Sequence, residues 1–375
     1  MEIAFVTTTP SININNWSGT EYYIAKALEH NFDVDYITDI KMNITPLVRL
    51  KKLLYRRGKE YLLTRNPEIT KDYAKQAMAR IKPSADIIFS PSTIPLAHIK
   101  TNKPKVFYTD ATFKYILNFH KDQGGICNKS IKEGIELEKK ALDSCHLAIF
   151  SSEWAAQSAI NDYRMDPNKI KVVPFGANID NELSEEEIIE LIRHRDLKTC
   201  NIVFIGTNWK EKGGDIVLET VKLLNEMGQH TILHIIGIQN LPFGSLPDYV
   251  VNHGFIDKAD DNNMKRIEHL IQQSHFLFVP SRMEAYGIVF CEAMAFGVPC
   301  ISSETGGIPT IIKNEQNGLL LPFEAQPKEY AEKIANLFKD NTRYFEMALN
   351  AYHNYTSRLS WDVVAETISK YIHQL

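Results

Sequence analysis

The fold is decided by residues 276–307, which read FLFVPSRMEAYGIVFCEAMAFGVPCISSETGG. The run 276–279 is apolar throughout, as in a strand whose two faces are both covered. A segment without helical periodicity separates this strand from helix-forming residues at 288–296, and a glycine and a proline then stop the helix. A second short strand at 300–302 precedes a second turn into a helix at Gly306. This order of strands, glycine turns and helices is typical of an α/β sheet.

The turn at Gly287 offers main-chain N–H groups to an anion. The first amides of a helix lack partners and the helix dipole adds partial positive charge, so the amides of Gly287, Ile288 and Val289 are expected to bind a phosphate. Glu284 lies just before this turn, and Glu292 lies about one helical turn inside the helix. Carboxylates accept hydrogen bonds from hydroxyls. The stretch therefore predicts a site for a diphosphate flanked by a nucleotide and a sugar.

The same block resembles the retaining glycosyltransferases of family 4. It carries Glu284 and Glu292 in the E-x7-E spacing, with Gly297-Val298-Pro299, TGGIP at 305–309 and NGLL at 317–320 after them. The resemblance implies an α/β protein of GT-B fold, with two Rossmann-like domains facing across a cleft. It also implies transfer of a hexose from a nucleoside-diphosphate sugar to a hydroxyl, with retention at the anomeric carbon. The alternative is a Rossmann-like half with two solvated glutamates.

Composition excludes several other classes. A chain of 375 residues is expected to form two domains, and 44% hydrophobic with 23% charged residues is ordinary for a globular protein. A net charge of −4 argues against a nucleic-acid binder. No apolar run reaches the ~20 residues of a membrane span, and the start of the chain reads as a strand rather than a secretory signal. The five cysteines lack C-x-x-C spacing, which favours reduced thiols in a cytoplasm and no zinc site.

The resemblance covers nearly the whole chain and predicts its division. Residues 1–180, joined by a C-terminal helix at about 360–375, are expected to form the acceptor-side Rossmann-like domain. Residues 181–358 are expected to form the donor-binding domain. An acidic helix at 184–194 is interpreted as a linker or surface element.

Gly19 is the donor-binding candidate of the first domain. It follows a strand and a polar loop and precedes a helix at 21–29. This position resembles the glycine loop of the family, whose backbone approaches the donor phosphate. The alternative is a helix start capped by Ser18 or Thr20.

Asp110 is the other candidate in this domain. It follows a strand at 105–108, at the carboxyl end where open α/β sheets bind ligands. Many family members place a histidine here that reaches the transferred sugar, whereas this chain reads TDATF at 109–113. Asp110 is therefore expected to contact the acceptor or the sugar, with His120 as the alternative.

Two lysines in the second domain are expected to neutralise the diphosphate. The family usually carries an arginine just after one glycine of this loop and a lysine before the next. Here Thr207 stands at the arginine position and Lys212 matches the lysine, so Lys210 is a candidate for the missing charge. With Glu284 binding sugar hydroxyls and Glu292 binding ribose, the expected catalytic residues are Glu284, Lys212 and Asp110.

The chemistry expected from these residues needs no metal and no cofactor beyond the sugar nucleotide as co-substrate. The D-x-D triplet at 33–35 is interpreted as a chance match. No carboxylate nucleophile is evident, so attack on the front face of the sugar, assisted by the leaving phosphate, is the working hypothesis. A short strand and loop at 253–256 are expected near the base, with Phe255 either beside it or in the core.

Residues 48–65, VRLKKLLYRRGKEYLLTR, place cations among leucines and tyrosines. The segment is expected to line one face of helices with Leu50, Leu53, Leu54, Tyr61 and Leu62 while its cations line another. This pattern predicts peripheral contact with the inner face of a membrane from the cytoplasm. The alternative is a solvated face that covers the core of the first domain.

Substrate identity stays open at this level. UDP-glucose or UDP-N-acetylglucosamine is the preferred donor, and a GDP-mannose-dependent mannosyltransferase is the alternative. Acceptors are glycans, lipid-linked sugars or polymers of the cell envelope. An epimerase or hydrolase of GT-B fold and a binding protein without catalysis are the other hypotheses.

Overall fold

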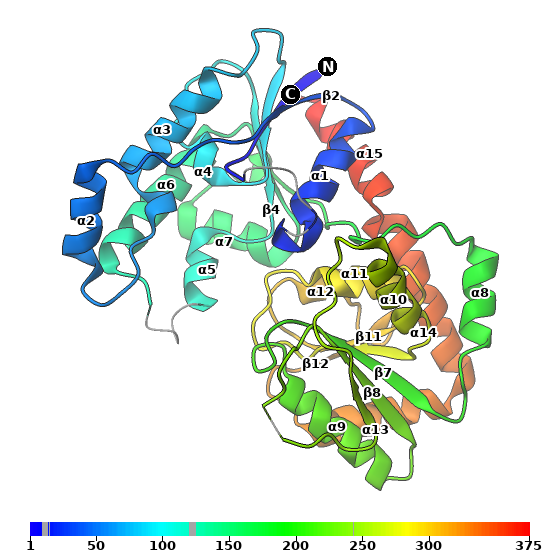
Figure 1. The fold of residues 1–375 in the computed structure, drawn as a ribbon. Coiled ribbons are helices and arrows are strands. Elements are labelled where there is room, and N and C mark those ends of the chain that lie inside the picture. The colour runs from blue at the N-terminus through cyan, green and yellow to red at the C-terminus, as the bar shows by residue number, and fades with distance from the viewer. Residues whose placement is uncertain (10–13, 15, 120–124, 243) are drawn as a thin grey trace. The chain divides into compact units, whose positions relative to one another are not determined.

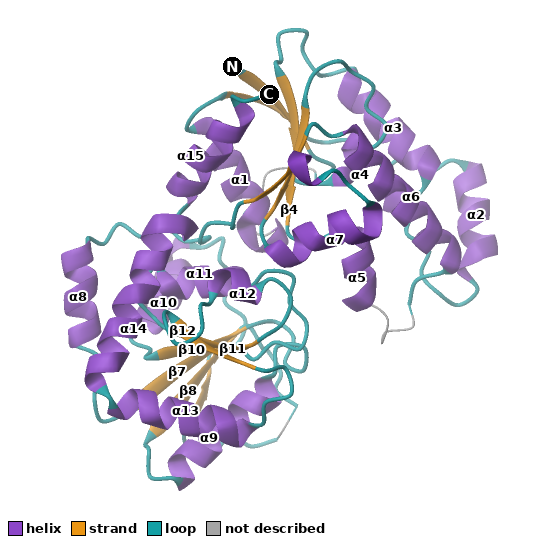
Figure 2. Cartoon of the chain, turned by 180° about the vertical axis from the view of Figure 1, so that it is seen from behind, coloured by secondary structure: helices purple, strands orange, loops and turns teal. Residues whose placement is uncertain are grey.

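The computed structural model describes residues 1–9, 14, 16–119, 125–242 and 244–375. The chain forms two compact units, Met1–Pro174 with Val364–Leu375, and Phe175–Val363. The division between Pro174 and Phe175 falls a few residues before the boundary that the sequence places at 180. In both units a sheet is covered by helices, which Figure 2 shows as strands in orange among helices in purple.

The first unit is built on a six-stranded parallel sheet of order β2-β1-β3-β4-β5-β6 (Figure 1). The strands are β1 (Glu2–Val6), β2 (Asp33–Ile37), β3 (Ile87–Ser90), β4 (Lys105–Thr109), β5 (Leu147–Phe150) and β6 (Ile170–Val172). The helices are η1 (Asn16–Gly19), α1 (Thr20–Glu29), α2 (Pro46–Arg56), η2 (Leu63–Arg65), α3 (Pro67–Met78), α4 (Thr93–Leu96), α5 (Phe113–Phe119), α6 (Asn128–Ser144), α7 (Glu153–Tyr163) and η4 (Pro167–Lys169).

The second unit repeats this architecture with a parallel sheet of order β12-β11-β10-β7-β8-β9. The strands are β7 (Cys200–Ile205), β8 (Thr231–Ile236), β9 (Val250–Asn252), β10 (Phe276–Phe278), β11 (Cys300–Ser303) and β12 (Gly318–Leu321). The helices are α8 (Glu185–Arg193), α9 (Gly214–Glu226), α10 (Asp261–Gln272), α11 (Ile288–Met294), α12 (Ile308–Ile311), α13 (Pro327–Lys339), α14 (Asn341–Asn354), η5 (Tyr355–Leu359) and α15 (Trp361–Ile372), whose last turns belong to the first unit.

The apolar strand sequences are explained by burial on both faces. Every residue of β3, β5, β10 and β11 is buried. A strand between two helical layers has no solvated face, so it reads as a continuous apolar run rather than an alternation. The strand and helix expected at 276–279 and 288–296 are therefore present, as β10 and α11.

The strand order of the second sheet indicates which part of its edge is expected to bind a ligand. The chain runs outward from β7 through β8 to β9, and then returns to the other side of β7 as β10. The two halves of the sheet diverge between β7 and β10. Open α/β sheets bind ligands at the carboxyl ends of the strands beside such a divergence.

Two local predictions are wrong. The strand expected at 253–256 lies earlier, as β9, and Phe255 is exposed rather than in the core. Within 48–65, Leu50, Leu53 and Leu54 lie on the exposed face of α2, but Tyr61 and Leu62 do not extend this face, because α2 ends at Arg56 and Tyr61 is buried outside the helix. In both cases the apolar run is too short for its sequence pattern to distinguish a strand, a helix and a buried loop.

Candidate functional site

Four loops meet at the carboxyl edge of the second sheet. They follow β7, β9, β10 and β11 and carry Lys212, Lys258, Glu284 and Gly306. Because all six strands are parallel, these loops leave the sheet on the same side. The expected diphosphate site is assembled from residues separated by up to about a hundred positions in the chain.

Lys212 and Glu284 form an ion pair beside the divergence of strand order. Lys212 Nζ lies 2.6 Å from Glu284 Oε2, and the exposed fractions of the two side chains are 24% and 12%. Ser281 Oγ donates to the same carboxylate oxygen at 3.4 Å. The structure thus brings together two of the three expected catalytic residues, in the loops that follow the neighbouring strands β7 and β10.

Backbone contacts fix the loop that carries Glu284. Gly306 has φ 55°, and a Cβ at this position would overlap the carbonyl oxygen of Glu284. Gly307 N–H donates to the carbonyl of Ala285 at 3.1 Å. Any side chain at position 306 would therefore clash with the backbone of Glu284. The positive φ of Gly306 also favours glycine over other residues.

Glu292 is paired with Lys258, a residue that the sequence analysis did not select. Lys258 Nζ lies 2.6 Å from Glu292 Oε1, and the Glu292 side chain is only 1% exposed. A carboxylate so deeply buried needs a partner, because desolvation of an unpaired charge is costly. In the sequence, Lys258 is distinguished only by its position in a loop after a strand. Lysines are too common in such loops for this position to indicate a functional residue.

The turn at Gly287 has the geometry expected from the sequence. Gly287 is the N-cap of α11 with φ 95°, and no side chain caps this helix. Ile288 and Val289 are partly exposed, whereas Tyr286 is buried and its hydroxyl donates to the carbonyl of Phe175 at 2.8 Å. Among the described residues, the N–H groups of Ile288 and Val289 have no backbone acceptor.

Lys210 differs from Lys212 in its surroundings. Its side chain is exposed, and its carbonyl accepts a hydrogen bond from Arg282 at 2.7 Å. Arg282 also donates to both carboxylate oxygens of Asp215, at 2.6 and 2.8 Å. Arg282 therefore joins the loop after β10 to the loop after β7, a structural role that the sequence analysis did not assign.

In the first unit, the structure brings the Gly19 loop and Asp110 together. Trp17 Nε1 donates to Asp110 Oδ2 at 3.3 Å. Gly19 is itself the N-cap of α1, with φ 87°. His120 lies outside the described residues.

Glu21 adds a buried carboxylate to the same loop. It lies in the first turn of α1 with 4% exposure, and both its oxygens accept from Thr9 Oγ1, at 2.7 and 2.8 Å. Nothing in the sequence distinguished Glu21 from the other acidic residues at helix starts.

Parts of this chain resemble known proteins in sequence. Residues 186–354 match the family model of glycosyl transferases group 1. A D-inositol 3-phosphate glycosyltransferase from Corynebacterium jeikeium is 24% identical over 64% of this chain and 59% of its own length. The chain spans about three fifths of the length of the curated relatives it matches.

Solved structures share the fold along the whole chain. Sucrose-phosphate synthase from Thermosynechococcus elongatus has a TM-score of 0.71 at 17% identity, covering 100% of this chain and 98% of its own. Anabaena Alr3699/HepE in complex with UDP and glucose has a TM-score of 0.65 at 17% identity, covering 100% of both chains. The chain therefore has the GT-B fold, and residues 186–354 carry the sequence pattern of the glycosyl transferases of group 1.

Proposed function

We propose that this chain is a retaining glycosyltransferase of family 4 that moves a hexose from a nucleoside-diphosphate sugar to a hydroxyl. One observation carries the proposal: Glu284 and Glu292, on either side of the Gly287 turn, are each held by a lysine from another loop at the carboxyl edge of the sheet. The match of residues 186–354 to group 1 glycosyl transferases supports this class of enzyme.

The diphosphate is the leaving group of the proposed reaction. The bond from the anomeric carbon to the diphosphate oxygen breaks, and a bond from that carbon to the acceptor oxygen forms on the same face. The acceptor proton passes to the departing phosphate. Lys212 and the amides of Gly287, Ile288 and Val289 stabilise the charge that develops there, and such electrostatic stabilisation is usually the largest catalytic contribution.

Donor binding has to rearrange one of the two ion pairs and can leave the other intact. Lys212 is neutralised by Glu284 at 2.6 Å, so stabilisation of a diphosphate by Lys212 requires the Glu284 carboxylate to turn to sugar hydroxyls. Glu292 binds the ribose hydroxyls while Lys258 keeps its charge compensated. Lys210, which is exposed, contributes longer-range attraction for the diphosphate.

In the first unit, Gly19 and Asp110 are the residues to which roles are proposed. Gly19 lets the backbone approach the donor phosphate, and Asp110 contacts the acceptor or the transferred sugar. The Trp17 indole donates a hydrogen bond to one oxygen of the Asp110 carboxylate, and a carboxylate can accept hydrogen bonds from hydroxyls. No metal is assigned, because the cations and helix amides take its place.

The proposed donor is UDP-glucose or UDP-N-acetylglucosamine, and the acceptor is a glycan, a lipid-linked sugar or a polymer of the cell envelope. The complex of Anabaena Alr3699/HepE with UDP and glucose supports a uridine nucleotide. The proposed location is the cytoplasm. Membrane contact through residues 48–65 is independent of the activity.

Product analysis tests the proposal. The chain is incubated with radiolabelled UDP-glucose, UDP-N-acetylglucosamine or GDP-mannose, with and without an extract of envelope glycans and lipids. A labelled glycoside that forms only with acceptor, with the anomeric configuration of the donor, is the expected result. Label released as free sugar would identify a hydrolase, an altered sugar nucleotide would identify an epimerase, and either would contradict the proposal.

A further inference from the structure

Helix α2 (Pro46–Arg56) turns a row of leucines away from the protein. The exposed fractions of Leu47, Leu50, Leu53 and Leu54 lie between 51% and 68%, whereas Val48 is fully buried. At 3.6 residues per turn these leucines fall on the side of the helix opposite Val48. Both ribbon views draw α2 at the outside of the first unit (Figures 1 and 2).

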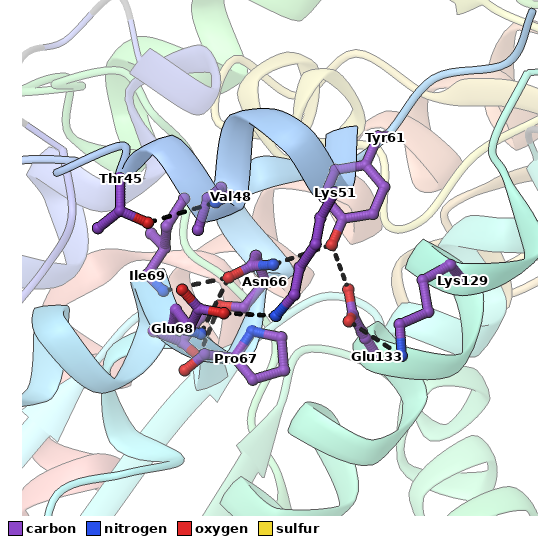
Figure 3. A network of polar contacts seen from close by, with 11 residues as sticks. Thr45, Val48, Lys51, Tyr61, Asn66, Pro67, Glu68, Ile69, Lys129 and Glu133 are labelled. Atoms are coloured by element: carbon purple, nitrogen blue, oxygen red, sulfur yellow. Dashed lines mark hydrogen bonds and ion pairs between the residues drawn. The ribbon is translucent and has the colours of Figure 1, made fainter. Parts of the chain in front are cut away.

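The inner side of α2 is anchored, so the leucines cannot rotate into the core. Lys51 forms an ion pair with Glu68 at the start of α3. Thr45 caps the helix by accepting from Val48 N–H at 3.3 Å, and Lys129 lies 5.8 Å from the centre of the Tyr55 ring. Figure 3 shows the Lys51 side chain reaching Glu68 at the start of α3.

The segment after α2 is held by a second set of contacts. Tyr61 donates to Glu133 at 2.8 Å and accepts from Asn66 at 2.8 Å, and Lys129 lies 3.3 Å from the same carboxylate (Figure 3). Tyr61, Asn66 and Glu133 are buried. The chain from α2 to α3 is therefore a fixed structure, and its outward leucines are a stable feature of the surface.

Cations surround this apolar face. Residues 46–65 carry seven basic side chains and one acidic side chain, a net charge of +6 in a chain of net charge −4. Lys52, Arg56 and Lys59 line a cavity of about 400 Å³ at the end of the helix, together with Glu60 and the backbone around Gly58. Three cations around one hollow of this size are suited to a phosphate group.

We propose that α2 lies on an anionic lipid bilayer, with Leu47, Leu50, Leu53 and Leu54 at the acyl boundary and a lipid phosphate in the cavity of Lys52, Arg56 and Lys59. An amphipathic helix with leucines on one face and cations beside them binds in this way. Among the described residues no helix is both long and apolar enough to cross a bilayer, so this contact is peripheral.

Charge favours lipid over a second copy of the chain. In a symmetric dimer formed through α2, the same surface patch of both copies would face each other. Arg49, Lys52 and Arg56 of one copy would then lie close to the equivalent cations of the other copy. Like charges across an interface are unfavourable. An anionic bilayer complements both the leucines and the cations, and this docking does not depend on glycosyl transfer.

Cosedimentation of the full chain with vesicles tests the proposal. Wild type is expected to bind vesicles of phosphatidylcholine mixed with phosphatidylglycerol, and not phosphatidylcholine alone. The variant Leu50→Ser/Leu53→Ser/Leu54→Ser should bind about 100-fold more weakly. Lys52→Gln/Arg56→Gln/Lys59→Gln should lose about fivefold for each cation removed.

Matched controls separate docking from general surface effects. Leu197 is 59% exposed and Lys328 is 78% exposed, and both lie in the other unit, so Leu197→Ser and Lys328→Gln should bind as wild type. The substituted leucines are already exposed, so their replacement should leave the melting temperature unchanged. In Leu53→Trp, the new indole should shift its emission to shorter wavelength on anionic vesicles only.

Three results would overturn the proposal. The first is failure of wild type to bind anionic vesicles, and the second is equal binding to vesicles of phosphatidylcholine alone. The third is a lipid-free dimer in sedimentation velocity that the leucine variant abolishes.

Discussion

Lys258 and Glu292 form an ion pair of 2.6 Å in which the carboxylate is almost completely removed from solvent. Their loop and helix follow strands β9 and β10, which lie on opposite sides of β7 in the sheet. The pair therefore links the two halves of the sheet at the edge where the donor is proposed to bind. It combines a role in stability with a role in orienting Glu292.

Lys258→Met should lower the free energy of unfolding by about 3 kcal/mol, because it leaves the buried Glu292 carboxylate uncompensated. The double variant Lys258→Met/Glu292→Gln should recover most of this loss, since no charge then remains in the pair. Urea denaturation of wild type, both single variants and the double variant measures the coupling. Lys222→Met, which breaks an exposed pair with Glu219, is the matched control. A Lys258→Met stability equal to that of this control would contradict the prediction.

Gly306→Ala should destabilise the second unit by about 2–4 kcal/mol and weaken nucleotide binding. The new Cβ meets the backbone carbonyl of Glu284, which cannot swing aside as a flexible side chain can. Gly228→Ala isolates the backbone contribution, because Gly228 has φ 78° but open space around its Cβ position. This control should cost about 1 kcal/mol and leave nucleotide affinity unchanged. Equal losses for the two variants, measured by denaturation, would show that contact with Glu284 is unimportant.

Phe255→Ala should leave thermal stability unchanged and weaken nucleotide affinity by about tenfold, the effect of losing one stacked base. The Phe255 side chain is 61% exposed, three residues before Lys258 on the same loop. Calorimetric titration with UDP measures the affinity. Leu246→Ala, at an exposed apolar position of the same unit, should bind UDP as wild type. Unchanged affinity in Phe255→Ala would remove Phe255 from the base site.

The stability of the protein should fall with acidification between about pH 6.5 and about pH 4, in part through His275. Burial, with a smaller effect of the Arg195 guanidinium, lowers the pKa of His275 to about 4. The unfolded chain therefore binds this proton first as the pH falls, so stability is complete above the unfolded pKa and decreases below it. Protonation of His275 lowers the free energy of unfolding by at most about 3 kcal/mol over this pH range.

His275→Asn tests this assignment, because its amide oxygen can replace Nδ1 as the acceptor of Asn201 N–H. The variant should be less stable than wild type near neutral pH, since the ring packs against Phe338 and Tyr344. The difference should narrow on acidification, as followed by urea denaturation at several pH values. A difference that stays constant down to about pH 4.5 would exclude His275 as a source of the acid sensitivity.

The sheet of the second unit was predictable because its strands are apolar runs between clear turn signals. Glu284, Gly287 and Glu292 lie in one such block, so their proximity follows from local chain geometry. Lys212 was selected through the resemblance alone, because it stands where the family carries a lysine before the second glycine of this loop. Glu284, Gly287 and Glu292 lie within nine consecutive residues, and their spacing is what made them recognisable.

Lys258 and Arg282 were not predictable, because their partners are set by strand order. Glu292 is 34 positions from Lys258, and Asp215 is 67 positions from Arg282. No sequence period links such pairs. The outward leucines of α2 were ambiguous for a different reason: periodicity defines an apolar face, but only tertiary contacts decide whether Val48 or Leu50 points to the core.

Calorimetric titration of UDP and GDP into wild type, Glu292→Gln and the exposed control Glu332→Gln tests the proposed donor site most directly. At least one nucleotide should bind saturably to wild type and to the control. Its affinity should be about tenfold or more weaker in Glu292→Gln, because hydrogen bonds to a charged group contribute about 1.5–3 kcal/mol. Absence of nucleotide binding to wild type, or equal affinity in all three proteins, would contradict the proposed donor site.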